Sequence, residues 1–255
     1  EVSPYFLSYM IDGLSLYKDC KEVASVHGYL PPISKECDLP DTFFLPGADC
    51  WGWATWRDRW SNFRRDPGNM AKEIRSLNLT HEFNLLSNYD YLGMLEDKAL
   101  KYNDSWAICW HATCYLADQV TLYPGRSLVK NIGLDLSGES CGTFEKKMMS
   151  TEVTDRAINV YKIPLFCDSK LFNIYCDYFK GFNAYPNPIV RILKRYIKKL
   201  AFKLSQNLPI YRSSKLTLIG PYPTYLDAKK ESTGYEDPCI LDKVLKASSN
   251  LLEGK

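Results

Sequence analysis

The chain has 255 residues, of which 45% are hydrophobic and 24% are charged. This composition is typical of a globular protein and excludes a chain that is disordered throughout. The 32 basic side chains nearly balance the 30 acidic ones and leave a net charge of +2. We therefore expect no nucleic-acid partner. No apolar run approaches the roughly 20 residues that a membrane-spanning helix needs.

Nine cysteines are scattered singly along the chain. Their spacing fits neither a compact disulfide framework nor a zinc ribbon. We expect reduced thiols, most of them in the core of a cytoplasmic protein. The sequence begins at Glu1 without an initiator methionine, and we expect it to be a fragment of a longer protein.

The first predicted element is a helix. Ser3-Pro4 is typical of a helix N-cap and first turn, and apolar residues then recur at helical spacing as far as Tyr17. Residues 22–26 and 42–45 are short apolar runs that end near a glycine or a proline, so we expect each to be a buried strand. Residues 54–63 are expected to be helical.

The next predicted elements are helices at residues 70–77 and 105–116 and a strand at residues 120–123, which enters the Pro124-Gly125 turn. Helices that alternate with short apolar strands indicate a layered α/β domain.

The most distinctive stretch runs from Phe44 to Trp60 and reads FLPGADCWGWATWRDRW. Gly52, between Trp51 and Trp53, would let the backbone pass close to a ligand. Flat indole faces suit the apolar faces of sugar rings, and Asp and Arg side chains bind hydroxyl and phosphate groups. The alternative interpretation is that these tryptophans only pack a core.

A second stretch, NDSWAICW at residues 103–110, places Asp104 and Ser105 where a helix is expected to start, beside Trp106. The Asp104 carboxylate would then be either a solvated helix cap or a base that accepts a hydroxyl proton among apolar walls.

A third stretch is rich in glycine. Gly133 and Gly138, with Asn131 and Asp135, form a loop that would fold over a substrate. The alternative is an ordinary surface loop.

Taken in order, these stretches resemble the C-terminal half of a bacterial sugar transferase of glycosyltransferase family 2, and more distantly the catalytic domains of the N-acetylglucosaminyltransferase I type. The matching phrases are SPYFLSYM, VASVHGY, DTFFLPGADCWGWATWRDRW, DSWAICW and LYPGRSLVKNIGLDLSG. The resemblance covers residues 1–142. It implies an α/β fold that is the C-terminal half of a GT-A nucleotide-sugar transferase domain.

The same resemblance implies an activity and its cofactor. It implies an inverting transfer of a sugar from a nucleotide-sugar donor to an acceptor hydroxyl, in glycan or surface-polysaccharide biosynthesis. A divalent metal, Mn²⁺ or Mg²⁺, would assist, and its acidic motif would lie immediately before Glu1. The chain alone would then be inactive.

The resemblance also assigns roles to individual residues. Asp104 would be the base. The residues placed around the substrate are Trp51, Gly52, Trp53, Trp106, Asn131, Gly133, Asp135 and Gly138. The chain departs from the family pattern at Cys109, where an arginine is usual, and at Leu134 and Glu139, near which a histidine is usual.

The remaining chain divides into two further predicted regions after a first domain at residues 1–145. Residues 146–215 are expected to be a linker with a basic amphipathic helix at Ile189–Leu204. This helix would either dock on a domain or lie on an anionic membrane, near a lipid-linked acceptor. The protein would then be cytoplasmic and peripheral on the inner face of the cell membrane.

Residues 216–255 contain GPYPTYLDAK and STGYEDPCILDKV, which resemble the opening of a class I methyltransferase domain. The resemblance implies S-adenosylmethionine as the cofactor of a part that is not in this chain, and a bifunctional parent protein. Two alternative functions remain: a non-catalytic carbohydrate-binding module, and a protein whose main activity is the C-terminal methyltransferase.

Overall fold

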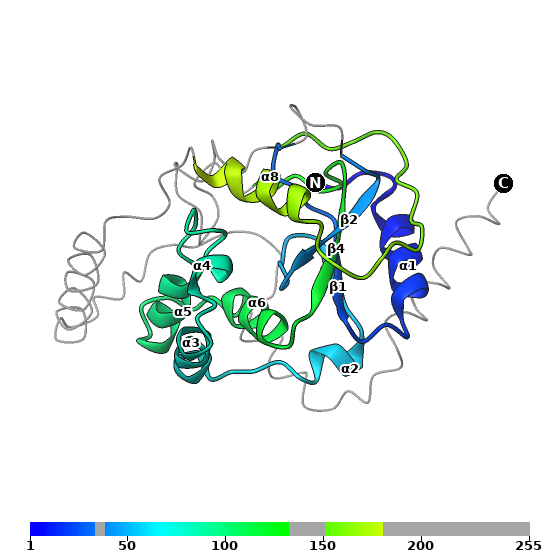
Figure 1. Ribbon diagram of the computed structural model, residues 1–255. Helices are drawn as coiled ribbons and strands as arrows, with labels where there is room; N and C mark the ends of the chain where they lie inside the picture. Colours follow the sequence, from blue (N-terminus) through cyan, green and yellow to red (C-terminus); the bar gives the residue numbers. More distant parts are fainter. Residues whose placement is uncertain (34–38, 133–150, 181–255) are drawn as a thin grey trace, which may run out of the picture. The chain divides into compact units, whose positions relative to one another are not determined.

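The structure is a computed structural model that describes residues 1–33, 39–132 and 151–180 (Figure 1). The chain divides into two compact units, Glu1–Asn207 and Leu208–Lys255. All the described residues belong to the first unit. The predicted basic helix and the methyltransferase-like segment lie outside the described residues.

The centre of this unit is a four-stranded mixed sheet with the strand order β2-β4-β1-β3. Its strands are β1 (Val23–His27), β2 (Thr42–Pro46), β3 (Trp53–Ala54) and β4 (Val120–Pro124). β1 and β4 are parallel, β2 is antiparallel to β4, and β3 is antiparallel to β1. The predicted α/β class is confirmed at this level.

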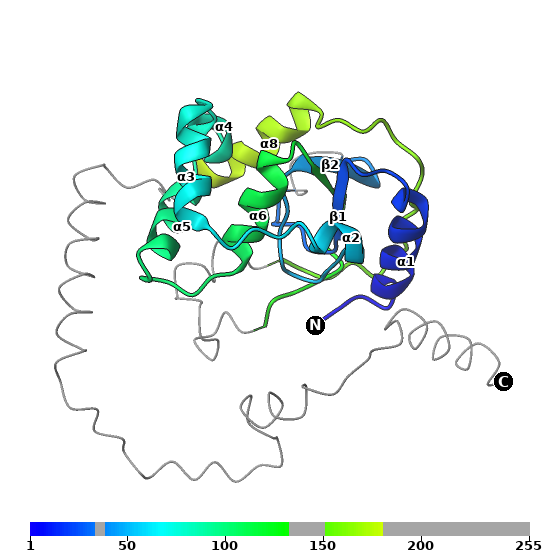
Figure 2. The same ribbon diagram turned by 90° about the horizontal axis from the view of Figure 1, so that it is seen from below.

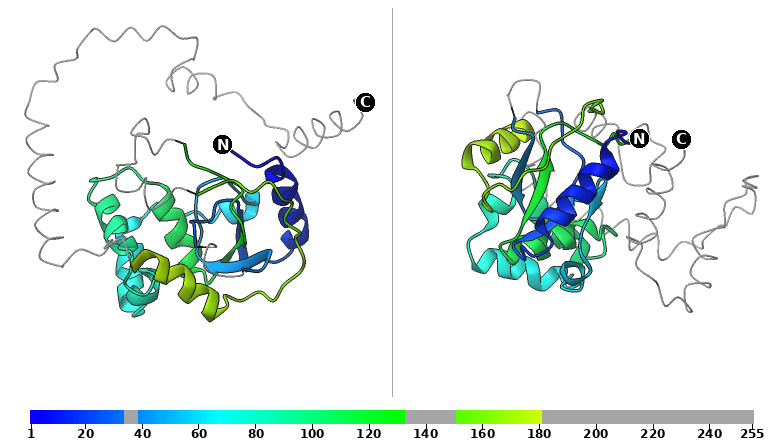
Figure 3. Two further views of the ribbon diagram at one scale, coloured as in Figure 1. Left: turned by 90° about the horizontal axis from the view of Figure 1, so that it is seen from above. Right: turned by 90° about the vertical axis from the view of Figure 1, so that its right-hand side faces the viewer.

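Helices cover both faces of the sheet. α1 (Phe6–Tyr17) lies across one face, while α6 (Ala107–Leu116) and α8 (Ser169–Lys180) lie on the other (Figures 1 and 3). Successive side chains of a strand point to opposite faces. In β4, Leu122 accordingly packs with α1 and Tyr123 packs with α8. The result is a three-layer arrangement.

A separate helical cluster packs against α6. It consists of α3 (Pro67–Ser76), α4 (Thr80–Phe83) and α5 (Tyr91–Ala99), and its core is formed by buried residues such as Met70, Ile74 and Leu95. Figure 2 shows these helices on the side of the sheet away from α1.

Most predicted elements are confirmed, but the helix expected at residues 54–63 is wrong. Trp53–Ala54 forms β3, and only α2 (Arg57–Trp60) is helical. Tertiary contacts account for the difference. Ala54 pairs with Val26 across the sheet, and Thr55 Oγ1 donates a hydrogen bond to the Ala24 carbonyl at 2.6 Å. These bonds to β1 hold the chain extended where its sequence alone is compatible with a helix.

Residues 151–180 belong to the same packed core. The Tyr17 hydroxyl of α1 donates a hydrogen bond to the Tyr161 carbonyl and accepts one from the Ile163 N–H, both at 3.0 Å. On the opposite face of the sheet, Phe179 of α8 packs in a cluster with Phe43. This part of the segment expected to be a linker therefore stabilises the first unit.

Two further properties concern only the part of the chain that the structure describes. Its cysteines are free thiols: Cys20, Cys50, Cys109, Cys114, Cys167 and Cys176. None of its helices is both long enough and apolar enough to cross a membrane.

Candidate functional site

The carboxyl ends of the parallel strands β1 and β4 lie at one edge of the sheet, and backbone hydrogen bonds join several chain segments there. Gly28 N–H donates to the Gly52 carbonyl, Leu128 N–H donates to the Gly28 carbonyl, and Ser3 N–H donates to the Leu128 carbonyl, each at 2.8 Å. Asn131 follows shortly after Leu128. This edge is where open α/β sheets usually bind ligands, and we take it as the candidate site.

Two glycines permit this close approach of the backbones. A Cβ atom on Gly28 would lie 2.7 Å from the Phe6 ring. Gly52 has a φ of +60°, and a Cβ there would lie 2.5 Å from Val129 Cγ2. A side chain at Gly52 would therefore collide with Val129, and whether a ligand approaches Gly52 stays a prediction.

The two tryptophans that flank Gly52 belong to different groups of side chains. The Trp51 ring packs edge-on against Tyr29, with 4.8 Å between the ring centroids. Trp53 packs with three other indoles, at 5.7 Å from Trp60, 5.9 Å from Trp106 and 5.7 Å from Trp110.

The indoles of this second group differ in burial. Trp110 is buried, whereas Trp60 is 37% and Trp106 is 44% exposed. The indole cluster therefore has a core and also a surface that a ligand can reach.

Asp104 lies just before α6 and close to this indole surface. Its carboxylate is fully exposed and lies 3.7 Å from Lys98 Nζ. Ile108 N–H donates to Ser105 Oγ at 3.4 Å, so Ser105 and not Asp104 makes the side-chain hydrogen bond at the start of this helix. The apolar walls expected around Asp104 are absent among the described residues.

The other predicted site residues are only partly described. Asn131 is among the last residues before a gap, and Gly133, Asp135 and Gly138 lie outside the described residues, as do Leu134 and Glu139. Cys109 is buried in the α3–α6 helical cluster, where burial raises the pKa of its thiol. It occupies a packing position of this core.

Sequence reasoning missed a carboxylate–imidazole pair at the same edge. Asp49 Oδ2 lies 3.7 Å from Nε2 of His27, the last residue of β1. His27 is completely buried, and within the described residues neither of its ring nitrogens makes a hydrogen bond. Burial lowers the pKa of His27, and the Asp49 carboxylate opposes that shift. The one signal in the sequence was the position of Asp49 inside the tryptophan-rich phrase.

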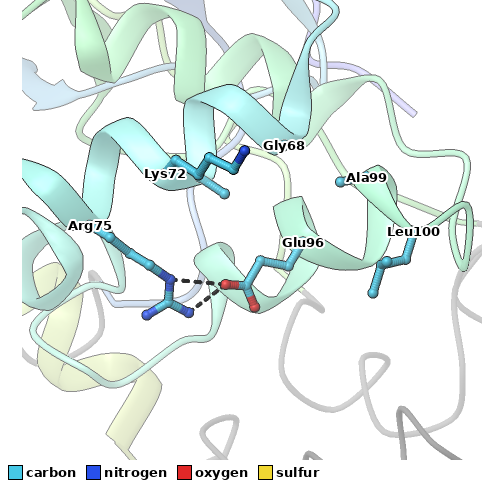
Figure 4. A pocket seen from close by; sticks show the side chains of 7 residues that line it. Gly68, Lys72, Arg75, Glu96, Ala99 and Leu100 are labelled. Carbon is cyan, nitrogen blue, oxygen red and sulfur yellow. Dashed lines mark hydrogen bonds and ion pairs between the residues drawn. The ribbon is translucent and has the colours of Figure 1, made fainter.

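A groove between α3 and α5 lies away from this edge and has a volume of about 280 Å³ (Figure 4). Arg75 Nε donates to Glu96 Oε1 at 3.1 Å across it. Among the residues that line the groove, Glu96 is the one carboxylate, and this ion pair holds it.

These observations define a mixed α/β protein with a candidate site at the carboxyl ends of β1 and β4. No protein-family model, curated protein or solved structure matches the chain.

Proposed function

We propose that the chain is the acceptor-side half of a GT-A-type inverting glycosyltransferase, which transfers a sugar from a nucleotide-sugar donor to a glycan or lipid-linked acceptor. One observation carries this proposal: the first residues of the chain contact the candidate site. Lys130 N–H donates to the Glu1 carbonyl at 2.9 Å, and Val2 pairs with Val129. A metal motif immediately before Glu1, as the resemblance implies, would therefore lie beside Gly52 and Asn131.

The indole surface supports an acceptor site near Asp104. Trp106 lies two residues after Asp104, is 44% exposed and packs against Trp53. An exposed indole face binds the apolar face of a sugar ring, and a carboxylate beside it accepts a hydrogen bond from a sugar hydroxyl.

In this proposal Asp104 acts as the general base. It takes the proton of the acceptor hydroxyl while the acceptor oxygen forms a bond to the anomeric carbon of the donor. The bond from that carbon to the nucleoside diphosphate breaks, the diphosphate leaves with the electron pair, and the configuration inverts. The exposure of Asp104 lets an acceptor reach it directly.

A bound Mn²⁺ or Mg²⁺ would neutralise the leaving diphosphate. No group of three or more His, Cys, Asp or Glu side chains among the described residues is arranged to hold such an ion. The resemblance puts its ligands in a motif before Glu1, and the role of Asp104 does not depend on them.

The test is a transfer assay on the full-length protein with a panel of radiolabelled nucleotide sugars. Asp104→Asn should lower kcat by about two to four orders of magnitude, the usual loss for a general base, and should leave donor binding unchanged. Asp12→Asn is the matched control, because Asp12 is exposed on α1. Absence of transfer with every donor, or unchanged turnover in Asp104→Asn, would contradict the proposal.

A non-catalytic carbohydrate-binding module is the second candidate function. The exposure of Trp60 and Trp106 favours it, because a binding surface needs only aromatic faces and hydrogen-bonding groups. Glycan binding that is lost in Trp106→Ala, without any sugar transfer, would support the module.

The proposals for a membrane contact and for a methyltransferase that uses S-adenosylmethionine rest on sequence outside the described residues. For the first, we expect salt-sensitive binding to anionic liposomes that is lost when the basic residues of Ile189–Leu204 are replaced by glutamine. A methyl-transfer assay on the full-length protein tests the second.

A further inference from the structure

Asp49 is a carboxylate beside the candidate site, and aromatic residues line the same cavity. It follows the Pro46-Gly47 turn, and its Oδ1 accepts a hydrogen bond from Cys50 N–H at 2.6 Å. Its side chain is 31% exposed, and its Oδ2 faces the buried His27 beyond hydrogen-bonding distance. Part of the Asp49 side chain is therefore open to a ligand.

Three tyrosines from separate elements line the same cavity as this carboxylate: Tyr91 of α5, Tyr123 of β4 and Tyr175 of α8. Burial raises the pKa of each, and the negative charge of Asp49 raises it further. A tyrosine hydroxyl can both donate and accept a hydrogen bond, so each of the three can serve a ligand in either role.

Asp49 and these tyrosines line a small cavity with a volume of about 20 Å³. This is room for about one water-sized group. Leu85 and Phe172 contribute apolar wall to the same cavity. Its size admits a single substituent of a ligand and excludes a whole ring.

The backbone beside the cavity is strained. Leu85, Leu86 and Ser87 have φ values of 50°, 54° and 67°, a left-handed conformation that disfavours residues with a Cβ atom. Such strain persists where the surrounding structure requires it and is frequent at ligand sites. Here it accompanies the placement of the buried Leu85 in the cavity wall.

The chemistry of the cavity selects among possible ligands. A carboxylate in the wall disfavours phosphate groups, so the cavity does not suit the diphosphate of a donor. A divalent metal would need further ligands, and the described residues contain no group of three or more that could hold one. A sugar hydroxyl fits, because it donates a hydrogen bond to the carboxylate and accepts one from a tyrosine hydroxyl.

The geometry points to a specificity subsite in which Asp49, with the hydroxyl groups of Tyr91, Tyr123 and Tyr175, binds one hydroxyl-bearing substituent of the sugar substrate. This inference rests on the proposed glycosyltransferase function. Asp49 is then a residue that selects the sugar, while Asp104 acts on the reacting hydroxyl.

Saccharide binding to the full chain tests the subsite without requiring turnover. The probes are glucose, galactose and mannose, each with its 6-deoxy counterpart. Glucose and mannose differ only at C2, glucose and galactose only at C4, and each sugar differs from its 6-deoxy counterpart only at C6. Binding is followed by ligand-observed NMR. The wild-type protein should distinguish the members of at least one pair. Asp49→Asn should bind the preferred sugar about 10- to 100-fold more weakly and lose the discrimination, as expected when a charged acceptor is removed.

A second variant and a control keep this test independent of folding defects. Tyr175→Phe retains the ring but removes the hydroxyl, and it should also bind the preferred sugar more weakly than the wild type does. Asp12→Asn should bind like the wild type. Absence of binding by the wild-type chain, equal binding of all the sugars, or unchanged discrimination in Asp49→Asn would overturn the inference.

The transfer assay separates this subsite from the proposed function. In the full-length protein, Asp49→Asn should raise KM for the sugar substrate and leave kcat within a few-fold. A fall in kcat with unchanged KM would instead place Asp49 at the reacting proton and overturn the subsite. Absence of transfer by the wild-type protein would refute the proposed function, and the binding experiment would still decide the subsite.

Discussion

Two tyrosines of α1 show how differently one hydroxyl group can be accommodated. Tyr9 and Tyr17 are both completely buried or nearly so. The Tyr17 hydroxyl makes two hydrogen bonds with residues 161–163, whereas the Tyr9 hydroxyl has no hydrogen-bond partner within the described chain. A buried hydroxyl without a partner costs free energy, while a bonded one contributes modestly to stability.

We therefore expect opposite effects from the same substitution. Tyr9→Phe should leave the free energy of unfolding unchanged or raise it by up to about 1 kcal/mol, and Tyr17→Phe should lower it by about 1–2 kcal/mol. Urea unfolding of the two variants measures both values. A larger loss in Tyr9→Phe than in Tyr17→Phe would contradict these contacts.

His27 makes the stability of the fold depend on pH. Burial lowers its pKa below the ordinary value of 6.5, although Asp49 opposes this. Because the unfolded chain then binds a proton more readily than the folded one, the contribution of His27 is complete above about pH 6.5 and is lost as the pH falls toward the folded pKa. Burial lowers the pKa of His111 in the same way.

Between pH 7 and pH 5 we expect the free energy of unfolding to fall by at most about 1.4 kcal/mol per pH unit for each of these histidines. His27→Gln should reduce this dependence. His81→Gln is the control, since His81 is exposed and bonded to Ser87 Oγ at 3.0 Å. Urea unfolding at several pH values measures the slopes, and equal slopes in the wild type and in His27→Gln would contradict the role of His27.

At the scale of elements, the candidate site depends on how closely the segments around Gly52 approach one another. Gly52 has a left-handed backbone and touches Val129, whereas a Cβ on Gly68 of α3 would find Ala99 Cβ at 3.7 Å, an ordinary contact. The two glycines thus provide a matched pair of substitutions to alanine.

Gly52→Ala should lower the free energy of unfolding by about 1–3 kcal/mol, because it combines backbone strain with a steric clash. It should also weaken saccharide binding at the adjacent edge. Gly68→Ala should raise the free energy of unfolding by about 0.5–1 kcal/mol, since alanine is the better helix former. Thermal and urea unfolding provide the measurement, and a neutral Gly52→Ala would refute the close approach.

For the first unit as a whole, residues 151–180 decide whether the sheet is covered. Ile158 packs on the α1 face, and Tyr175, Cys176 and Phe179 pack on the opposite face. Burial of each large apolar side chain contributes about 1.5–3 kcal/mol. Their loss would remove much of the roughly 5–15 kcal/mol that stabilises a typical domain.

A chain that ends at residue 145, the predicted domain boundary, should therefore not fold cooperatively. A chain that ends at residue 207, the limit of the compact unit, should fold. Near-UV circular dichroism and thermal unfolding distinguish the two outcomes. A sharp unfolding transition in the shorter chain would show that the segment from Thr151 to Lys180 is dispensable.

Local sequence patterns were sufficient for β1, β2, β4 and α6. Each is an apolar run with a clear period and clear ends, and such signals depend only on neighbouring residues. They were insufficient for β3, since Ala54 is extended only because β1 lies beside it. They also left the packing of α8 in the core undetected, because burial of a helix face depends on the partner it meets.

The candidate site divides in the same way. The sequence placed Trp51, Gly52, Trp53, Trp106 and Asp104 together by resemblance, and the structure brings Trp53 and Trp106 into contact. The tryptophan-rich phrase drew attention to the neighbourhood of Asp49, but neither its pairing with His27 nor the convergence of three tyrosines had a local signal. Residues from different strands and helices become neighbours only when strand order and helix packing are set, and those depend on contacts between distant parts of the chain.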